Sequence, residues 1–314
     1  MNAIQLNPSL NDEQRRTRLY EGDLFLYSAT AGSRALCDLA KTMACEAFAP
    51  HAPEQAQFHL PVEKYVEILA QLKPAFIHHP RCKELIRQIF EELGMEPDQS
   101  YFDVPRLRTM THGDYLKAGL AYAFHAHRDT WFSAPPAQIN WWIPVYDICL
   151  ENTIAFYPQY WSQPLQNSSR IYNYYRWNRD SRRAAAQQIK TETRQQPQAE
   201  ETIDDAGQLR LVCEAGGIVL FSGAYLHATV PNTSGHTRFS IDFRTVHRGD
   251  VIAQRGAPNI DSACTGTSLR DFLRATDYER LPDDVVAMYE NESDIDGEVV
   301  FDPTQTPQQT ANAG

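Results

Sequence analysis

The sequence predicts a mainly β protein in which a helical N-terminal part buttresses a jelly-roll-like core. Residues 31–96 place apolar side chains at helical spacing in three segments. From about residue 100 to 248, short runs of aromatic and β-branched residues follow one another between turn residues. Helices do not alternate with these runs, which favours an antiparallel sandwich or barrel over a parallel sheet.

The helical part follows a predicted strand, GDLFLYSAT, at residues 22–30. The first helix is predicted over SRALCDLAKTMACEAFA, with Ser33 as its N-cap, because a serine hydroxyl can accept a hydrogen bond from the first turn. Two more amphipathic helices are predicted over residues 61–76 and 81–95, and Pro61 opens the first of them.

The β core is predicted from six runs: YFDVPRLRTM, YAFHAHRDTWF, QINWWIPVYDI, NTIAFYPQYW, GGIVLFSG and HTRFSIDFRTV. A polar segment that is predicted to be helical, residues 176–196, separates the fourth run from the fifth. We therefore expect residues 162–210 to form an insertion over the mouth of the barrel. The domain prediction is a polar arm at 1–21, one domain at 22–285 and an acidic disordered tail at 286–314.

Charge and cysteine content restrict the partners and the compartment. The net charge of −11 argues against nucleic acid as a partner, since such proteins usually carry a basic surface. Six scattered cysteines without a CxxC pair suit buried thiols in a reducing compartment. The polar N-terminal residues lack the apolar segment of a secretory signal, and no run of about 18 apolar residues predicts a membrane span. We expect a cytoplasmic protein that binds neither nucleic acid nor membrane.

The segment AFHAHRDTWF contains the first candidate metal ligands. His125, His127 and Asp129 occupy alternate positions, and alternate side chains of a strand point to one face. His227 follows in FSGAYLHATVPN. Two imidazoles and one carboxylate leave three positions of a metal open, which is typical of non-haem Fe(II) oxygenases. The HxD triplet alone is weak evidence, because a sheet histidine and a turn aspartate also explain it.

The run TRFSIDF adds a candidate anion site. Arg238 comes eleven residues after His227, and an arginine beside an iron site is suited to bidentate capture of a carboxylate. Ser240 shares the strand face of Arg238 and could hydrogen-bond the same carboxylate.

The ordered set HRD, QINWWIPVYDICLEN, GGIVLFSGAYLHATVPN and TRFSIDFR resembles the Fe(II)/2-oxoglutarate-dependent dioxygenase superfamily, and most closely its phytanoyl-CoA dioxygenase branch. The resemblance covers about residues 100–248 and implies a double-stranded β-helix, the jelly-roll form of a cupin-like barrel. It implies Fe(II) bound by His127, Asp129 and His227.

The same resemblance implies 2-oxoglutarate as co-substrate, its distal carboxylate bound by Arg238 and Ser240, with Trp142 against the co-substrate. The implied activity is hydroxylation of an unactivated C–H bond of a small molecule, with O2 consumed and 2-oxoglutarate decarboxylated to succinate. Halogenating members replace the carboxylate of the first motif with a small residue, so Asp129 disfavours halogenation. The branch usually carries a Pro-Gly-Ser-His run where this chain reads FYPQYWSQP, which predicts a rebuilt surface loop.

Other functions remain open on the same residues. A desaturase, an epimerase or a ring-forming oxidase would use the same cofactors, and the barrel could be a non-catalytic cupin-like binding module. A cupin with three histidines would need a glutamate near positions 131 and 132, which are Trp and Phe, so His125 is expected beside a ligand or in the core. A catalytic zinc site would not require Arg238.

The predicted insertion contains the candidates for substrate binding. Four aromatic residues at its start could clasp a substrate or pack the insertion onto the core: Tyr172, Tyr174, Tyr175 and Trp177. Residues 170–194 contain seven basic and two acidic residues, which is a local reversal of charge in an acidic chain. This segment could attract an anionic small molecule or form a solvated helix face, and we treat the anionic substrate as a hypothesis.

Overall fold

The computed structural model describes residues 3–121 and 125–290, without the side chain of Arg183. Most of the predicted acidic tail, residues 291–314, lies outside the described residues. The helices are α1 (Asp12–Tyr20), α2 (Ala31–Phe48), α3 (Val62–Ile77), α4 (Pro80–Glu92), α5 (Tyr174–Arg176), α6 (Arg248–Ile252) and α7 (Asp283–Ala287). The strands are β1 (Ile4–Leu6), β2 (Leu24–Tyr27), β3 (Ser100–Phe102), β4 (Arg106–Met110), β5 (Ile139–Pro144), β6 (Ile154–Phe156), β7 (Leu209–Leu211), β8 (Ile218–Ser222), β9 (His227–Thr229), β10 (Arg238–His247) and β11 (Leu273–Arg274).

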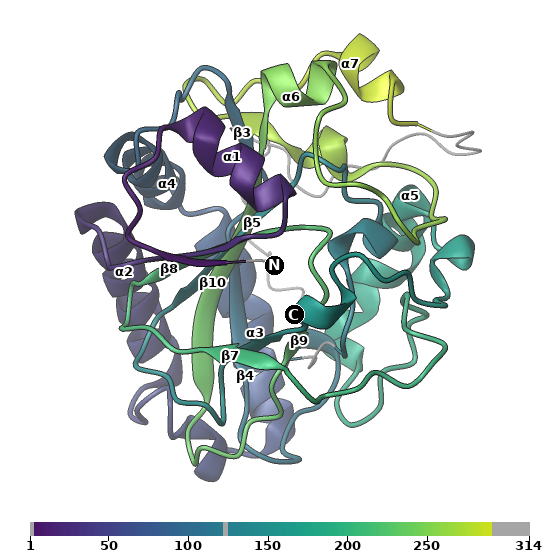
Figure 1. The fold of residues 1–314 in the computed structure, drawn as a ribbon. Helices are drawn as coiled ribbons and strands as arrows, with labels where there is room; N and C mark the ends of the chain where they lie inside the picture. Colours follow the sequence, from purple (N-terminus) through teal and green to yellow (C-terminus); the bar gives the residue numbers. More distant parts are fainter. Residues whose placement is uncertain (1–2, 122–124, 291–314) are drawn as a thin grey trace.

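The strands form two sheets. The large sheet has eight strands in the order β1-β2-β8-β5-β10-β3-β11, with β4 paired to β10 off this path. The small sheet has the order β7-β6-β9. Helices α2 and α4 lie together against one side of the large sheet, and the irregular segment around α5 lies on the other side (Figure 1).

The prediction of a mainly β protein is wrong in its proportions. Among the described residues, helices of all kinds account for 35% and strands for 19%, and the strands do not close a barrel. The fold is a mixture of helices and two sheets. The prediction from β-prone composition made the strands too long. A segment of such residues forms a strand only where another strand is available to pair with its backbone. In NTIAFYPQYW, for example, only Ile154–Phe156 are paired, and Pro158, which has no N–H, opens a 3₁₀ turn.

Two further predictions need correction. The HAHRD segment is not a strand: His127 forms a single bridge with His227, and Asp129 begins a 3₁₀ turn, Asp129–Phe132. The polar helix predicted at 176–196 is helical only to Gln187, first as a π turn, Trp177–Ser181, and then as a 3₁₀ turn, Arg182–Gln187.

Helix α2 begins one turn earlier than predicted. Its N-cap is Thr30, whose Oγ1 accepts from the backbone N–H of Ser33 at 3.2 Å, while Ser33 Oγ accepts from the backbone N–H of Thr30 at 2.9 Å. Ser33 is therefore the third residue of a capping box, not the cap. Its hydroxyl also donates to the carbonyl of Gly216 at 2.7 Å, which ties the start of α2 to the turn before β8.

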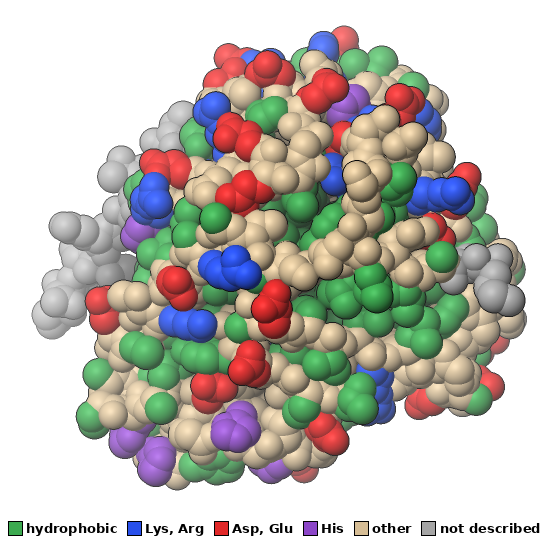
Figure 2. Space-filling model, turned by 60° about the vertical axis from the view of Figure 1, so that its left-hand side comes forward, with side chains coloured by type: hydrophobic (Ala, Val, Ile, Leu, Met, Phe, Trp, Pro, Cys, Tyr) green, Lys and Arg blue, Asp and Glu red, His purple; other side chains and the backbone are tan. Residues whose placement is uncertain are grey.

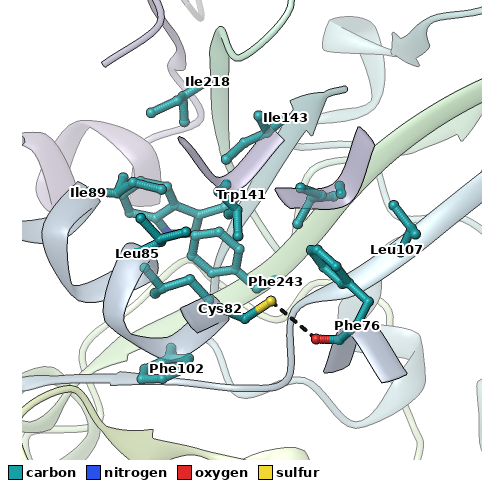
Figure 3. Close-up of a cluster of buried hydrophobic side chains, with 14 of the residues drawn as sticks. Phe76, Cys82, Leu85, Ile89, Phe102, Leu107, Trp141, Ile143, Ile218 and Phe243 are labelled. Atoms are coloured by element: carbon teal, nitrogen blue, oxygen red, sulfur yellow. Dashed lines mark hydrogen bonds between the residues drawn. The ribbon is translucent and has the colours of Figure 1, made fainter. Parts of the chain in front are cut away.

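The core lies between the helices and the large sheet (Figure 3). The ring of Phe90 on α4 lies 5.4 Å from that of Trp141 and 6.1 Å from that of Phe243, measured between centroids. The thiol of Cys82 donates to the carbonyl of Phe76 at 3.1 Å, so a buried polar group in this layer is satisfied locally. Burial of one large apolar side chain here contributes about 1.5–3 kcal/mol.

Strand β10 separates this core from the site described below. Phe239, Ile241 and Phe243 are almost completely buried in the core. The alternate residues, Arg238, Ser240, Asp242 and Arg244, belong to the opposite face because side chains alternate along a strand. Strand β10 is paired with β5 along one edge and with β4 along the other, so its polar face lies in the middle of this part of the large sheet.

None of the described helices is long and apolar enough to cross a membrane. On the face of the molecule in Figure 2, acidic and basic side chains are interspersed, so neither sign of charge dominates that face.

Candidate metal and co-substrate site

A cavity of about 500 Å³ lies between the two sheets. Its walls come from β4, β5, β8 and β10 of the large sheet, β6 and β9 of the small sheet, helix α3, and residues 172–196. This volume is ordinary for a small-molecule pocket. Five of the six predicted site residues line it: His127, Asp129, Trp142, His227 and Arg238. Ser240 is fully buried and is not among the lining residues.

The two histidines and the aspartate meet at one end of this cavity. Backbone hydrogen bonds of 2.9 and 3.0 Å join His127 and His227, and the backbone N–H of Asp129 donates to the carbonyl of Gly223 at 2.8 Å. The Oδ1 atom of Asp129 lies 3.4 Å from Nε2 of His127 and 3.9 Å from Nε2 of His227. One donor atom from each of the three residues lies within 4.8 Å of the others.

Backbone carbonyls determine how both imidazoles are presented. Nδ1 of His127 donates to the carbonyl of His125 at 2.7 Å, and Nδ1 of His227 donates to the carbonyl of Tyr225 at 2.9 Å. A carbonyl can only accept, so the ring proton is on Nδ1 and the lone pair of Nε2 faces the cavity. Burial and the neighbouring His127 lower the pKa of His227 to about 4, so its imidazole is neutral at neutral pH.

The carboxylate of Asp129 is charged and oriented. Burial opposes its ionisation, but the guanidinium of Arg244, the strongest favourable influence, holds its pKa well below the usual range. Its Oδ2 accepts from Nε2 of Gln138 at 2.9 Å and lies 3.5 Å from Nε of Arg244. One oxygen is thus held by the protein, while Oδ1 faces the imidazoles.

The sequence analysis missed Gln138 and Arg244. Arg244 also pairs with Asp103 at 3.0 Å, which fixes the guanidinium beside the site. A signal was present, since Arg238, Ser240, Asp242 and Arg244 occur at alternate positions of one predicted strand. Such an alternating polar run next to an apolar one indicates a functional face along the whole strand.

Arg238 on β10 and Trp142 on β5 form another part of the cavity wall. The guanidinium carbon of Arg238 lies 5.5 Å from the centroid of the Trp142 ring. One terminal nitrogen of Arg238 donates to the carbonyl of Asn152 at 3.1 Å. Within the described residues, Nε of Arg238 and Oγ of Ser240 have no hydrogen-bond partner although both are buried. Burial lowers the pKa of Arg238 to about 10, so the side chain stays cationic at neutral pH.

These donors fit the groups that the sequence implied. Two imidazoles whose Nε2 atoms face the cavity and one carboxylate are ligands that divalent iron accepts in proteins. A buried guanidinium with a free Nε–H fits a carboxylate, since an unpaired buried donor is costly. His125 is different: its side chain is exposed, and its backbone carbonyl contacts the site through His127. Of the two predicted places for His125, the core is wrong, whereas its backbone carbonyl does lie beside the ligand His127.

The segment around α5 supplies part of the cavity wall. Three of its four predicted aromatic residues, Tyr172, Tyr174 and Trp177, line the cavity. Tyr175 does not, and its hydroxyl donates to Glu290. Part of the predicted positive charge forms surface ion pairs: Arg170 pairs with Glu200 at 2.7 Å and Arg179 with Asp180 at 2.6 Å.

Comparison with known proteins adds a family and weak structural similarities. No curated protein matches the chain. EvdO2 from Micromonospora carbonacea var. aurantiaca, complexed with 2-oxoglutarate, is 14% identical, with a TM-score of 0.42 over 77% of this chain and 93% of that one. ThoJ, a non-heme monooxygenase, is 14% identical, with a TM-score of 0.39 over 74% of this chain and 76% of that one. SnoN, a non-heme alpha ketoglutarate dependent epimerase from nogalamycin biosynthesis, is 11% identical, with a TM-score of 0.37 over 75% and 82%.

These TM-scores are all below 0.5, so the assignment rests on the family match and the site. Residues 48–240 match the family described as phytanoyl-CoA dioxygenase (PhyH), which is more than half of the chain. The matched range contains the three clustered donors and Arg238, and this set fits the Fe(II) and 2-oxoglutarate that the family uses. The chain belongs to the phytanoyl-CoA dioxygenase family.

Proposed function

We propose that the protein hydroxylates an unactivated C–H bond of a small molecule as an Fe(II)/2-oxoglutarate-dependent oxygenase. In the balanced reaction, one oxygen atom of O2 enters the product alcohol and the other enters succinate, while 2-oxoglutarate loses CO2. The observation that carries the proposal is that a His–Asp–His donor set lines one cavity with a buried arginine whose Nε–H has no partner among the described residues. Bound iron with 2-oxoglutarate supplies the oxidising power.

We assign the metal ligands as His127, Asp129 and His227. The two backbone carbonyls behind the imidazoles hold the Nε2 lone pairs toward the metal position. Gln138 and Arg244 hold Oδ2 of Asp129, which leaves Oδ1 as the metal-facing oxygen. A donor set that is oriented before the metal arrives loses less entropy on binding.

We assign Arg238, Ser240 and Trp142 to the co-substrate. Arg238 has a free Nε–H for the distal carboxylate of 2-oxoglutarate, and Ser240 has a free hydroxyl on the same face of β10. The Trp142 ring holds the guanidinium in place from one side. Binding at this end fixes the orientation of the keto acid along the cavity.

The catalytic unit in this proposal is a single domain at residues 22–285 with a double-stranded β-helix core, and residues 162–210 cover the cavity. Tyr172, Tyr174 and Trp177 contribute from that cover to the wall. Their role is to exclude water and place the substrate. Placement within about an ångström decides whether the same cofactors yield an alcohol, an alkene, an inverted centre or a ring.

The test is an anaerobic titration of metal-free protein with Fe(II) and 2-oxoglutarate, following the visible charge-transfer band of the iron–keto-acid complex. We expect a band in the wild type and none in Asp129→Ala. In Arg238→Met the band should need about 10–100-fold more 2-oxoglutarate, because a charged hydrogen bond is lost. His125→Ala is the matched control, since that side chain is exposed.

A wild-type protein that binds iron but shows no band with 2-oxoglutarate would remove the proposed co-substrate. Zinc bound more tightly than iron, with hydrolysis and no succinate formed, would favour a zinc enzyme. Binding of both groups without turnover of 2-oxoglutarate in any substrate screen would favour the binding-module alternative.

A further inference from the structure

The cavity is lined by an excess of cations. Seven lining side chains are basic: Lys73, Arg106, Arg108, Arg182, Arg194, Arg238 and Arg244. Only two are carboxylates, Asp129 and Asp242. In a chain with a net charge of −11, a concentration of positive charge around one internal space is a specific feature of that space.

Four of the seven cations are paired with carboxylates of the protein. Arg106 and Arg244 share Asp103, at 2.6 and 3.0 Å. Arg108 pairs with Asp242 at 2.6 Å, and Arg194 pairs with Glu192 at 2.7 Å. Arg238 is assigned above to 2-oxoglutarate. Lys73 and Arg182 are then left to be explained.

No carboxylate within the described part of the chain forms an ion pair with Lys73 or Arg182. The ammonium of Lys73 donates to the backbone carbonyl of Leu120, and the guanidinium of Arg182 donates to Oδ1 of Asn178 at 3.2 Å. Both acceptors are neutral. The carboxylate of Asp271 accepts from the hydroxyl of Tyr174 and acts on Arg182 from outside ion-pair distance.

Each of these two side chains also faces a second cation. Burial and Arg108 lower the pKa of Lys73 to about 7, and the carboxylate of Asp242 offsets this only in part. Burial and Arg106 likewise lower the pKa of Arg182, and Asp271 offsets this only in part. A protein-only arrangement of this kind is unfavourable, because buried charges are stabilised by opposite charges. A bound anion would supply the missing charge to both.

Lys73 and Arg182 are each influenced by an arginine of strand β4. Arg106 and Arg108 are two residues apart on β4, so their side chains lie on one face of it, about 7 Å apart along the strand. Arg106 lowers the pKa of Arg182 and Arg108 lowers that of Lys73, and all four side chains line the same cavity, where α3 packs against both β4 and residues 182–187. The cationic region is therefore compact, and it belongs to the β4 side of the cavity.

An aromatic wall leads from the metal donors along the cavity. The ring of Phe132 lies 5.3 Å from the imidazole of His127, that of Tyr172 lies 5.4 Å from Phe132, and that of Trp177 lies 6.0 Å from Tyr172. All four line the cavity. Such a surface suits an apolar or aromatic body, which can pack against the aromatic faces.

We propose that the substrate is a small carboxylic acid with an apolar body, whose carboxylate binds Arg182 and Lys73 while the body lies along Phe132, Tyr172 and Trp177. The planar fork of Arg182 matches a carboxylate in two-point geometry. The carbon to be oxidised lies at the Phe132 end, beside the metal donors. This inference rests on the proposed function for the identity of the metal end, but the anion site itself does not need turnover.

The test uses full-length protein loaded with Fe(II) and saturating 2-oxoglutarate under anaerobic conditions. Its probes are matched pairs of aryl and alkyl carboxylic acids and their primary amides, with aryl phosphates as a third arm. The first readout is the charge-transfer band, which must persist so that displacement of 2-oxoglutarate is excluded. The second readouts are the shift of that band and the rise in Tm on adding each probe.

We expect acids to bind at least about 10-fold more tightly than their amides, since a charge-assisted hydrogen bond in a buried site is replaced by a neutral one. Arg182→Met should remove this preference and Lys73→Met should reduce it, while both variants keep the band. Arg176→Met is the matched control, because Arg176 belongs to the same segment but is exposed and does not line the cavity.

An intact band with no acid preferred over its amide would overturn the inference and leave the proposed function standing. Absence of the band in the wild type would instead sink the proposed function. Acid preference that survives in Arg182→Met, or phosphates that bind more tightly than acids, would also overturn the assignment of a carboxylate to this pair.

Discussion

The two faces of β10 carry opposite chemistry on one strand. On the helix side, Phe239, Ile241 and Phe243 are at most 1% exposed and pack into the core. On the cavity side, Arg238 and Arg244 are charged and largely enclosed. Apolar burial stabilises the fold, whereas buried charge costs free energy unless it is paired. Stability is therefore concentrated on one side of the large sheet, and the proposed ligand binding lies on the other.

Two parts of the cavity wall differ in whether their polar atoms have partners from the protein. At the metal end, Oδ2 of Asp129 and both Nδ1 atoms have partners from the protein. On the β4 and β10 side, Nε of Arg238 has no partner among the described residues, and Lys73 and Arg182 have only neutral acceptors. The first arrangement orients ligands for a metal. The second is completed by anions from outside the chain.

The largest expected effect is a loss of stability from a substitution in the core on the helix side of the large sheet. Phe90→Ala should lower the free energy of unfolding by about 3–5 kcal/mol, because it leaves a cavity between α4 and the rings of Trp141 and Phe243. Iron affinity at low temperature should be nearly unchanged. Urea unfolding and a chelator titration measure the two quantities, with Phe58→Ala as control, since Phe58 is 51% exposed. Equal losses of stability in both variants would contradict this division between the faces.

A second change addresses the metal end alone. Gln138→Met removes the hydrogen bond to Oδ2 of Asp129 and should weaken iron binding about 10–100-fold, as loss of a ligand-orienting partner generally does. The free energy of unfolding should change by less than that in Phe90→Ala. Competition with a chelator checks the affinity, and Gln71→Met on the exposed side of α3 is the control. Unchanged affinity would show that Arg244 alone orients the carboxylate.

The smallest expected effect is the pH dependence of stability that Lys73 causes, since no described carboxylate forms an ion pair with it. Because burial lowers the pKa of Lys73 to about 7 from 10.5, the unfolded chain binds more protons than the folded chain between these values. The destabilisation by Lys73 is complete below pH 7 and disappears as pH rises to about 10.5. Lys73→Met should therefore raise Tm by about 2–4 °C at pH 7 and by nothing near pH 10.5. Calorimetry at several pH values checks this, and a constant difference would show that the ammonium is not the cause.

The match to the phytanoyl-CoA dioxygenase family confirms the resemblance that four short motifs predicted. The local argument for the metal ligands was less accurate. His127 and Asp129 were placed on one face of a strand, but His127 forms a single bridge and Asp129 opens a 3₁₀ turn. The donors still meet, because backbone hydrogen bonds to His227 and Gly223 bring the turn to the end of β9.

Other site residues were within reach of the sequence. Arg244 continues the alternation that begins at Arg238, and a strand's period of two is a local property that a sequence displays. Lys73 was out of reach, because it lies in an ordinary amphipathic helix and enters the cavity only through the packing of α3 beside β4. Arg182 likewise depends on the path of the segment after α5.

The amino-acid order alone was enough to predict the family, the helical N-terminal part, the alternation along β10, and the residue types able to hold iron and a carboxylate. Each of these follows from order, spacing or local periodicity. The mixture of helices and sheets, the oxygen of Asp129 that faces the imidazoles, and the cations without a carboxylate among the described residues became known from the folded chain. These depend on contacts between residues far apart in the chain, and the free energy of a buried charge is set by such neighbours rather than by adjacent residues.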